Sequence, residues 1–443
     1  MRRIFGAFAY GDGPRDTCWW DETVKPRDWR RAVDDHNVDV CIIGAGYTGL
    51  NAALALAEAG ASVIVLDSRF PGWGASGRNG GFCCLGGAKI SQKLLESRFG
   101  KDQALAYRRA ERAAVEHVAA LIDRFGWDVD RHSSGETELA HSAKAMAGMA
   151  AMAKEIEELY GCTPTLHEVA DLPALGMGGE FHGGLTTPIG FGLNPRKYLD
   201  ALATAAIAAG ARIFGHSCAT GIVTQTKDNV VETATGGRIK AQNIVFALNG
   251  YADETLSAWL RGRYMPTQSN VLVTRPLREN ELAAQGWTSA QMAYDSRNLL
   301  HYFRLMPDRR FLFGLRGGLR SSPNAEARAR RVARRDFERM FPDWSHVEST
   351  NAWSGMVCLS TKALPFCGPI PDTRGFWTAF AYHGNGVAMG SYLGSMLGKM
   401  ISGTIRHDAL PKPISEPPRR WPLGRFRRLL MPPLYAALAL KDF

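Results

Sequence analysis

Three glycines with a fixed spacing follow the first apolar run of the chain. The run Val38 to Ile43 is β-branched and apolar, and Gly44, Gly46 and Gly49 come directly after it in a GxGxxG pattern. The first glycine suits a tight turn, the second permits close approach of a pyrophosphate, and the third lets helix and strand touch. The pattern therefore predicts a phosphate site at the N-terminus of the next helix.

The elements around these glycines complete a strand-helix-strand unit. Residues 51–59 are rich in alanine and leucine, as in a helix packed on a sheet, and a second apolar strand over 62–66 ends at Asp67. An acid at that position accepts hydrogen bonds from ribose hydroxyls. The cofactor contacts predicted from this unit are Gly44, Ala45, Gly46, Thr48, Gly49, Asp67, Ser68 and Arg69.

Hydrophobic periodicity gives a coarse map of the rest of the chain. Helices are expected over 91–99, 102–125, 143–160, 194–209, 325–341 and 387–402. Strand-like segments are 129–140, a pair within 179–191, 211–214, 221–226, 230–235, 243–248, 265–274, 299–306, 310–315 and 375–382. In the last helix, glycines recur every fourth residue from Gly386 to Gly398. This repeat favours close packing on a sheet or on the cofactor, since Lys399 and the short length argue against helix pairing in a membrane.

The bulk composition is that of a globular protein of more than one unit. Its 443 residues are 45% apolar and 22% charged, and the eight cysteines form no CxxC pair or metal-like cluster. We therefore predict no metal site, no disulfides and a cytoplasmic location. The apolar start of the chain is too short for a signal peptide, and no apolar run is long enough to span a membrane.

Half of the net charge of +10 lies in the C-terminal tail. Residues 411–443 hold seven basic residues against two acids, together with seven prolines. The prolines favour an extended strap on the protein's own surface, although contact with anionic lipid, a partner or nucleic acid stays open. The first 37 residues read as an irregular arm whose Trp19, Trp20 and Trp29 pack on the body.

After the nucleotide unit comes a glycine-rich loop that distinguishes a flavin-binding protein from a nicotinamide-binding one. This loop, Gly74 to Gly81, resembles that of the FAD-dependent D-amino acid oxidase superfamily, particularly its branch of glycine, sarcosine and γ-glutamylputrescine oxidoreductases. Four further segments agree in order, namely 246–251, 295–304, 307–314 and the His383-Gly384-Asn385-Gly386-Val387 turn. The resemblance covers residues 38 to 403.

The resemblance implies an α/β (α+β) fold, in which a Rossmann-like FAD-binding domain carries an inserted substrate domain on a mixed, largely antiparallel sheet. The FAD-binding domain would be discontinuous (38–125, 192–260 and 350–403), with the substrate domain over 126–191 and 261–349 and a tail over 404–443. FAD would be held without a covalent bond. Its additional predicted contacts are Gly74, Ala75, Ser76, Arg78, Asn79, Gly80, Gly81, Gly384, Asn385, Gly386 and Val387. Arg78 would pair with the phosphate of the flavin or, alternatively, close on the substrate, and the otherwise glycine-rich loop favours the phosphate.

The implied reaction is oxidation of a carbon–nitrogen bond in an amine or amino acid. Hydride would pass to flavin N5, and the imine would hydrolyse to a carbonyl compound and an amine. Arg316 is the first candidate for clamping a substrate carboxylate. Tyr302, His383 and Tyr251 are further candidate catalytic residues. Arg304 shares a strand face with Tyr302, so it either lies over the flavin or forms an ion pair at an interface.

The chain also departs from the family pattern. No lysine occurs between Lys240 and Lys362, where sarcosine-type oxidases carry one that assists reaction with oxygen, and Ala388 replaces another lysine. The electron acceptor is therefore either O2 or another compound. Cys358 lies near a segment that binds flavin covalently in some relatives, but its surroundings match poorly.

Two other readings of the same residues remain open. An NAD-dependent dehydrogenase would use the same nucleotide unit, but it leaves the 74–81 loop and the late glycine turn unexplained. A flavin-bearing scaffold or nucleic-acid-associated protein would use the basic tail. We expect a small-molecule substrate and no nucleic-acid partner.

Overall fold

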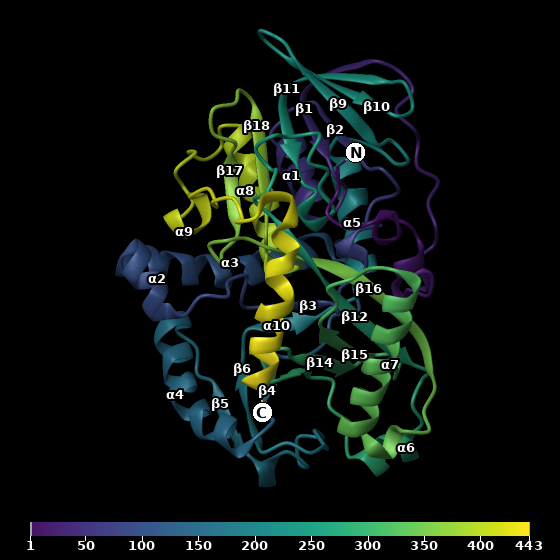
Figure 1. Cartoon of the computed structure of the whole chain (residues 1–443), viewed down its shortest axis with the longest axis vertical. Helices are drawn as coiled ribbons and strands as arrows, with labels where there is room; N and C mark the ends of the chain where they lie inside the picture. Colours follow the sequence, from purple (N-terminus) through teal and green to yellow (C-terminus); the bar gives the residue numbers. More distant parts are fainter. Residues whose placement is uncertain (1, 443) are drawn as a thin grey trace.

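The computed structural model describes residues 2–442, and two large β-sheets organise it along the long axis of the molecule (Figure 1). The first sheet has the order β17-β18-β11-β1-β2-β8, with a β9–β10 hairpin attached to β11. Its strands are β1 (His36–Ile43), β2 (Val63–Leu66), β8 (Arg212–Phe214), β9 (Ala219–Thr224), β10 (Asn229–Thr233), β11 (Arg238–Phe246), β17 (Phe366–Pro369) and β18 (Phe376–Phe380).

The centre of this sheet is parallel, since β1 pairs in parallel with both β11 and β2. Val40 and Ile42 face one core cluster, whereas Cys41 and Ile43 face another. A strand buried on both faces explains the continuous apolar run in the sequence. The predicted strand-helix-strand unit is thus confirmed.

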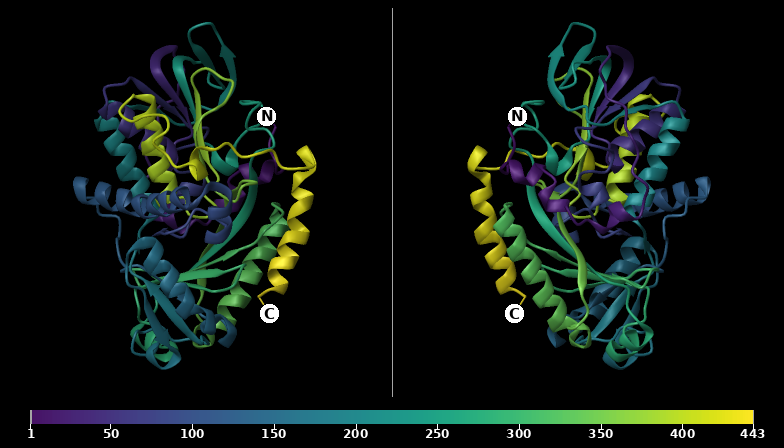
Figure 2. Two further views of the ribbon diagram at one scale, coloured as in Figure 1. Left: turned by 90° about the vertical axis from the view of Figure 1, so that its left-hand side faces the viewer. Right: turned by 90° about the vertical axis from the view of Figure 1, so that its right-hand side faces the viewer.

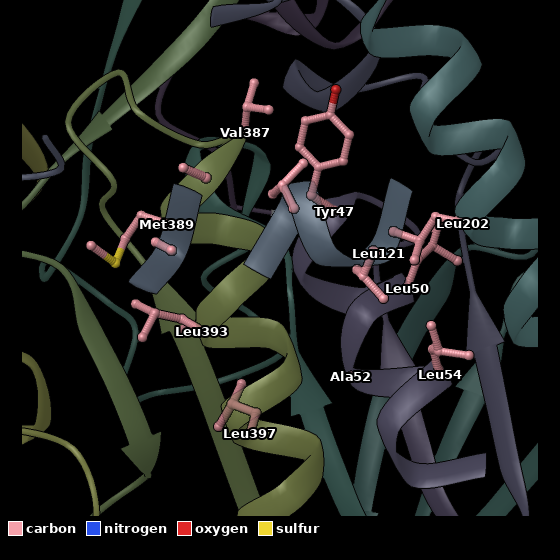
Figure 3. Packing of buried hydrophobic residues seen from close by; sticks show 14 of the residues in the cluster. Tyr47, Leu50, Ala52, Leu54, Leu121, Leu202, Val387, Met389, Leu393 and Leu397 are labelled. Atoms are coloured by element: carbon pink, nitrogen blue, oxygen red, sulfur yellow. The ribbon is translucent and has the colours of Figure 1, made fainter. Parts of the chain in front are cut away.

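Helices α1 (Tyr47–Glu58), α3 (Lys101–Phe125), α5 (Pro195–Ala208) and α8 (Ala388–Ile401) build the core on one face of the first sheet. Figure 3 shows Leu50 of α1 beside Leu121 of α3 and Leu202 of α5, with Leu393 and Leu397 following α8 on the other side of the same cluster. Asn194 caps α5 by accepting hydrogen bonds from the N–H groups of Arg196 and Lys197. The opposite face is covered by the β9–β10 hairpin and by the segment 252–264.

The spaced glycines of α8 give the expected close packing, but the neighbour is helix α1 rather than a sheet or the cofactor. A Cβ on Gly394 would lie 2.3 Å from the Thr48 carbonyl oxygen, and one on Gly398 would lie 2.8 Å from the Ala52 carbonyl oxygen. Glycine is therefore required here because two helix backbones meet with no room for a side chain.

The second sheet has the order β16-β12-β15-β14-β13-β4-β6-β5. Its pairs are antiparallel apart from β13–β4, so the expectation of a mixed, largely antiparallel sheet is confirmed. Its strands are β4 (Glu136–Leu139), β5 (Thr165–Glu168), β6 (Gly183–Thr187), β12 (Met265–Thr274), β13 (Met292–Asp295), β14 (His301–Leu305), β15 (Phe311–Arg316) and β16 (Ser349–Leu359). A short pair, β3 (Phe82–Cys84) and β7 (Gly190–Gly192), stands apart from both large sheets.

Strand β16 departs from the expected domain division. Residues 350–359 were assigned to the FAD-binding domain, but β16 pairs with β12 over nearly its whole length. The boundary predicted at residue 350 therefore needs to move to about the end of β16. The segment predicted as a strand over 129–140 is interrupted: Glu136–Leu139 forms strand β4, and before it His132 makes only an isolated bridge to Gly192.

Aromatic rings gather on one face of the second sheet. There α7 (Pro323–Met340) packs Phe337 against Phe311 and Phe313. The remaining helices are α2 (Gln92–Phe99), α4 (Ala143–Tyr160), α6 (Glu279–Gln285), α9 (Lys412–Ser415) and α10 (Met431–Leu440). Short 3-10 turns occur at η1 (Ala7–Tyr10), η2 (Gly13–Arg15), η3 (Trp19–Glu22), η4 (Ala75–Gly77), η5 (Val169–Asp171), η6 (Asn249–Tyr251), η7 (Pro342–Trp344) and η8 (Gly424–Leu430).

The two ends of the chain lie on the body. In the N-terminal arm, Trp20 and Trp29 are buried as expected, while Trp19 is half-buried. In the tail, residues 424–440 are helical (η8 and α10), so the prediction of an extended strap is wrong there. Pro432 and Pro433 occupy the first turn of α10, where a missing N–H costs no helical hydrogen bond. Figure 2 shows α10 at the periphery of the molecule.

Candidate functional site

A cavity of about 360 Å³ opens at the carboxyl ends of β1 and β2. This is the position where parallel α/β sheets bind nucleotides. The residues predicted to bind the cofactor that line it are Gly44, Gly46, Thr48, Asp67, Ser68, Arg69, Gly74, Ala75, Ser76, Asn79, Gly384, Gly386 and Val387.

The glycine turn has the shape that was expected from its spacing. Gly44 has φ +111°, and a Cβ there would lie 2.6 Å from the Ala247 carbonyl oxygen. A Cβ on Gly49 would lie 1.9 Å from the Gly44 carbonyl oxygen, so α1 touches the turn. Gly46 faces the cavity and the Ser76 hydroxyl, which accepts a hydrogen bond from the Tyr47 N–H at 3.0 Å. The two glycine-rich segments therefore meet at the helix N-terminus.

The Asp67 carboxylate orders this turn from the end of β2. Its Oδ2 accepts a hydrogen bond from the Ala45 N–H at 3.0 Å, and its Oδ1 accepts one from the Arg69 N–H at 2.9 Å. Burial raises the pKa of the carboxyl above its ordinary value, although these N–H groups oppose that rise. Asp67 lines the cavity while it holds the loop, so it can also meet a ribose.

The N-terminus of α8 closes the cavity from the opposite side. Tyr382 and Thr48 join the two sides through a hydroxyl-hydroxyl hydrogen bond of 2.7 Å. The next residue, His383, is buried with φ +51°, and its Nδ1 makes no hydrogen bond within residues 2–442. Burial lowers the pKa of His383 to about 3, so the imidazole is neutral.

A second cavity, of about 240 Å³, adjoins the first and reaches the second sheet. The two cavities share the lining residues Ala75, Asn79, Met356, Val357, His383, Gly384 and Val387. A molecule that extends from the nucleotide turn to Gly384 would therefore form a wall of the second cavity. This continuity, the glycine cradle and the orphaned His383 nitrogen fit a long dinucleotide such as FAD.

Arg316 and Tyr302 both line the second cavity, as the sequence analysis expected of substrate-facing residues. Across residues 2–442 the Arg316 guanidinium has no hydrogen-bonding or ion-pair partner, and burial lowers its pKa. Its Nη2 lies 3.0 Å from where a Cβ of Gly384 would stand. The Tyr302 hydroxyl is 3.0 Å from the Ser269 hydroxyl. Arg316 is thus a cation that faces the cavity near the late glycine turn.

Sequence reasoning missed two ionisable residues of this cavity, Lys89 and Glu136. Lys89 comes from the loop after β3, and its exposed side chain lines the cavity. Desolvation, assisted by the nearby Arg316, lowers its pKa to about 7. The cavity therefore contains a lysine, Lys89, although the strand lysine of sarcosine-type oxidases is missing.

Glu136 enters the cavity from β4 and is only 8% exposed. Burial raises its pKa to about 8. Glu138, two residues on, shares its strand face and accepts a hydrogen bond from the Tyr294 hydroxyl at 3.2 Å. The sequence did contain a signal for Glu136: it alternates with Glu138 along a strand that was expected to face the substrate.

Arg304 and Tyr251 lie in different surroundings. Arg304 faces neither cavity and forms no ion pair: it donates to the Leu193 carbonyl at 2.8 Å and contacts His132 Nε2 at 3.0 Å. Both alternatives weighed for Arg304 are therefore wrong. Tyr251 lines the first cavity rather than the second, and its hydroxyl accepts a hydrogen bond from the Met356 N–H.

Arg78 lies away from the nucleotide turn, where a phosphate contact was expected. Its guanidinium carbon is 4.2 Å from the centre of the Trp73 ring, and its Nε donates to the Trp73 carbonyl at 2.7 Å. It lines the second cavity, and its Nη2 makes no hydrogen bond in the described chain. Arg78 therefore lies toward the substrate side of the site.

The other predicted contacts are distributed around the two cavities. Gly80 and Asn385 line the second cavity, and the Asn385 amide donates to the Cys84 carbonyl at 2.7 Å. Gly81 lines neither, but its φ of +75° and a Cβ position 2.1 Å from the Leu193 carbonyl oxygen require glycine. Cys358 lines the first cavity, and burial raises the pKa of its thiol to about 12.

Within residues 2–442 no group of three His, Cys, Asp or Glu side chains is placed to hold a metal ion. In the same range, none of the helices has both the length and the apolar character needed to cross a membrane. The eight cysteines are all unpaired.

Comparison with known proteins agrees with this geometry. A family model described as FAD dependent oxidoreductase matches residues 39–400. Gamma-glutamylputrescine oxidoreductase of Escherichia coli is 30% identical over 375 residues, which cover 84% of this chain and 85% of that protein. The probable oxidoreductase OrdL of Haemophilus influenzae is 27% identical over 440 residues, covering 98% and 95% respectively.

Among solved structures, glycine oxidase from Geobacillus kaustophilus aligns with a TM-score of 0.70. It is 20% identical and the alignment covers 86% of this chain and 98% of that chain, so it shows a shared fold. The match of the family model over most of the chain confirms the predicted resemblance and the FAD cofactor. The chain therefore belongs to the FAD-dependent oxidoreductases of the D-amino acid oxidase family.

Proposed function

We propose that this enzyme oxidises the carbon–nitrogen bond of an amine that also carries a carboxylate. One observation carries the proposal: the Arg316 guanidinium, unpaired within residues 2–442, faces a cavity that continues into the cofactor cavity. Arg316 is half-buried and faces the cavity without a partner, so an anionic ligand that displaces water there would stabilise the cation. A carboxylate can accept two parallel hydrogen bonds from a guanidinium.

The remaining residues support binding rather than proton transfer. Lys89 would add a second positive charge toward the carboxylate when it is protonated, and Tyr302 would close the side of the cavity formed by the second sheet. His383 is neutral and has a free Nδ1, so it suits a hydrogen bond to substrate or cofactor more than a charge.

FAD, when bound, supplies the chemistry by accepting hydride from the carbon next to the amine. The nucleotide turn at Gly44 to Gly49 would hold its pyrophosphate, and the turn before α8 would lie against its ring system. The high pKa of Cys358 supports noncovalent binding, because a thiol rather than a thiolate is a poor nucleophile. The imine product would hydrolyse to a carbonyl compound and an amine.

The activities for which two relatives are named support an amine or amino acid as substrate. These relatives are gamma-glutamylputrescine oxidoreductase and the glycine oxidase of Pseudomonas aeruginosa, which is 22% identical. The electron acceptor stays a prediction, either O2 or another compound. Lys89 provides an ammonium in the cavity, so the lack of a strand lysine no longer argues against O2.

Anaerobic mixing with a panel of amines tests the proposal. We expect amines with a carboxylate to bleach the flavin absorbance faster than neutral amines of the same size. Arg316→Gln should lower kcat/KM for the carboxylated amines about 100-fold or more, because a charge-assisted bidentate pair is lost. Arg320→Gln, an exposed arginine four residues away, is the matched control. Equal losses for neutral and carboxylated amines would contradict the role of Arg316.

A further inference from the structure

The C-terminal helix exposes an apolar face to solvent. In α10, the residues turned toward the body are Met431, Tyr435, Leu438 and Ala439, which are buried or half-buried. Its exposed residues are Pro432, Pro433, Leu434, Ala436, Ala437 and Leu440. A surface helix normally turns polar side chains outward, so this helix lacks the face that water favours.

The exposed apolar surface continues into the turn before the helix. Leu423 is 56% exposed, Phe426 55%, Leu429 66% and Leu440 75%. Single exposed apolar residues are common, but large ones grouped within 18 residues mark a contact surface.

Basic side chains surround this apolar surface. Residues 417–441 contain six basic residues and no acid. Arg419, Arg420 and Arg425 are exposed, as is Lys441, whereas Arg428 is half-buried. Trp421, near the start of the segment, is half-buried, and its indole N–H has no partner in the chain from 2 to 442.

The body holds this segment in place. Arg427 is 1% exposed, and its Nη2 lies 2.6 Å from Glu254 Oε1, while its Nε donates to the Tyr264 carbonyl at 3.0 Å. At the far end, Asp442 accepts hydrogen bonds from the N–H groups of Asn298 and Leu299. The apolar and basic side chains are therefore presented from a docked segment.

We propose that residues 417–441 bind an anionic lipid surface. In this arrangement α10 lies in the plane of the interface, with its apolar face among the acyl chains and the arginines at the headgroups. Ten residues are too few to span a bilayer, so the contact is peripheral. This inference does not depend on the proposed amine chemistry.

Charge favours lipid over the other possible occupants. Two copies of this surface would bring its four exposed basic residues against the same four without any acid between them, which disfavours self-association. Nucleic acid would satisfy the arginines but would leave Leu429, Leu434 and Leu440 in water. An anionic bilayer satisfies both kinds of side chain.

Sedimentation of the holoenzyme with vesicles tests this surface. We expect binding to vesicles of phosphatidylglycerol and phosphatidylcholine, weak binding to phosphatidylcholine alone, and a decrease as salt rises. The Arg419→Gln/Arg420→Gln/Arg425→Gln triple variant should bind roughly 100-fold more weakly, since each basic residue contributes about 1 kcal/mol. Arg30→Gln/Arg31→Gln, two exposed arginines of the N-terminal arm, should leave binding unchanged.

A second variant separates the apolar contribution. Phe426→Ser/Leu429→Ser/Leu434→Ser should lower vesicle binding at least ten-fold, whereas Val169→Ser, at a 56% exposed site elsewhere, should not. Both variants should retain FAD, because the altered side chains are exposed. No binding to anionic vesicles would overturn the proposal, as would a dimer at micromolar concentration that the triple serine variant dissociates.

Discussion

Replacing Gly394 by alanine should push α8 away from α1 and loosen the cofactor site. The added Cβ would stand 2.3 Å from the Thr48 carbonyl oxygen and 2.8 Å from Thr48 Cα, where contacts under 3.0 Å do not persist. The two helices must therefore separate by at least about 0.7 Å. Neither backbone atom can rotate away, since both belong to the first turn of α1.

Overpacking of this kind lowers the free energy of unfolding by about 1 to 3 kcal/mol. The higher helix propensity of alanine relative to glycine raises it by about 1 kcal/mol. We expect a net loss of up to about 2 kcal/mol in unfolding free energy. Because Thr48 and Gly46 line the cofactor cavity, the Kd for FAD should rise about ten-fold.

Gly148→Ala is the matched control for this change. Gly148 lies within α4 with no atom within 4 Å of its Cβ position, so alanine there should stabilise by about 1 kcal/mol. Urea unfolding and fluorescence titration of the apoprotein with FAD would measure both variants. If Gly394→Ala behaved like Gly148→Ala in both assays, the close packing of α1 on α8 would not control the cofactor site.

Three further predictions concern charged side chains. Glu136→Gln should stabilise the protein by about 2 to 4 kcal/mol near pH 8 and should have almost no effect near pH 4.5. The reason is that the pKa of Glu136 is about 8 in the folded protein and 4.5 ordinarily, so the wild-type protein loses stability as pH rises between these values. An equal effect at both pH values in urea unfolding would contradict this. Lys89 loses its charge above a pKa of about 7, so the Ki of a simple carboxylate inhibitor should rise between pH 6 and pH 8, and Lys89→Met should abolish that rise. Arg427→Met removes the closer of the two cations at the buried Glu254 and leaves only Arg2, 3.4 Å away, so it should cost up to about 3 kcal/mol or release the tail to proteolysis, whereas the exposed Arg425→Met should do neither.

Much of the fold could be predicted from local sequence patterns, such as glycine spacing and helix-capping residues. The glycine spacing after β1 and the four-residue repeat in α8 each have a short-range cause, and both occur in the structure as predicted. Helix α4 also agrees with its predicted bounds, because Ser142 caps it and Gly161 ends it in a left-handed conformation.

The features that could not be predicted from the sequence depend on contacts between residues far apart in the chain. Strand β16 joins the second sheet through β12, about 85 residues earlier in the chain, and no local pattern reports that partner. Lys89 and Glu136 reach one cavity from separate elements, so neither stands out alone. In the tail, the prolines favour an extended strap, but Pro432 and Pro433 begin a helix because the first helical turn needs no proline N–H.

Acid precipitation of the purified protein, followed by analysis of the supernatant, tests the central claim most directly. The contiguous cavities and the buried, protonated Cys358 predict one FAD per chain, released intact into the supernatant. A nicotinamide nucleotide in place of FAD, or flavin that stays with the precipitated polypeptide, would contradict the account of this site.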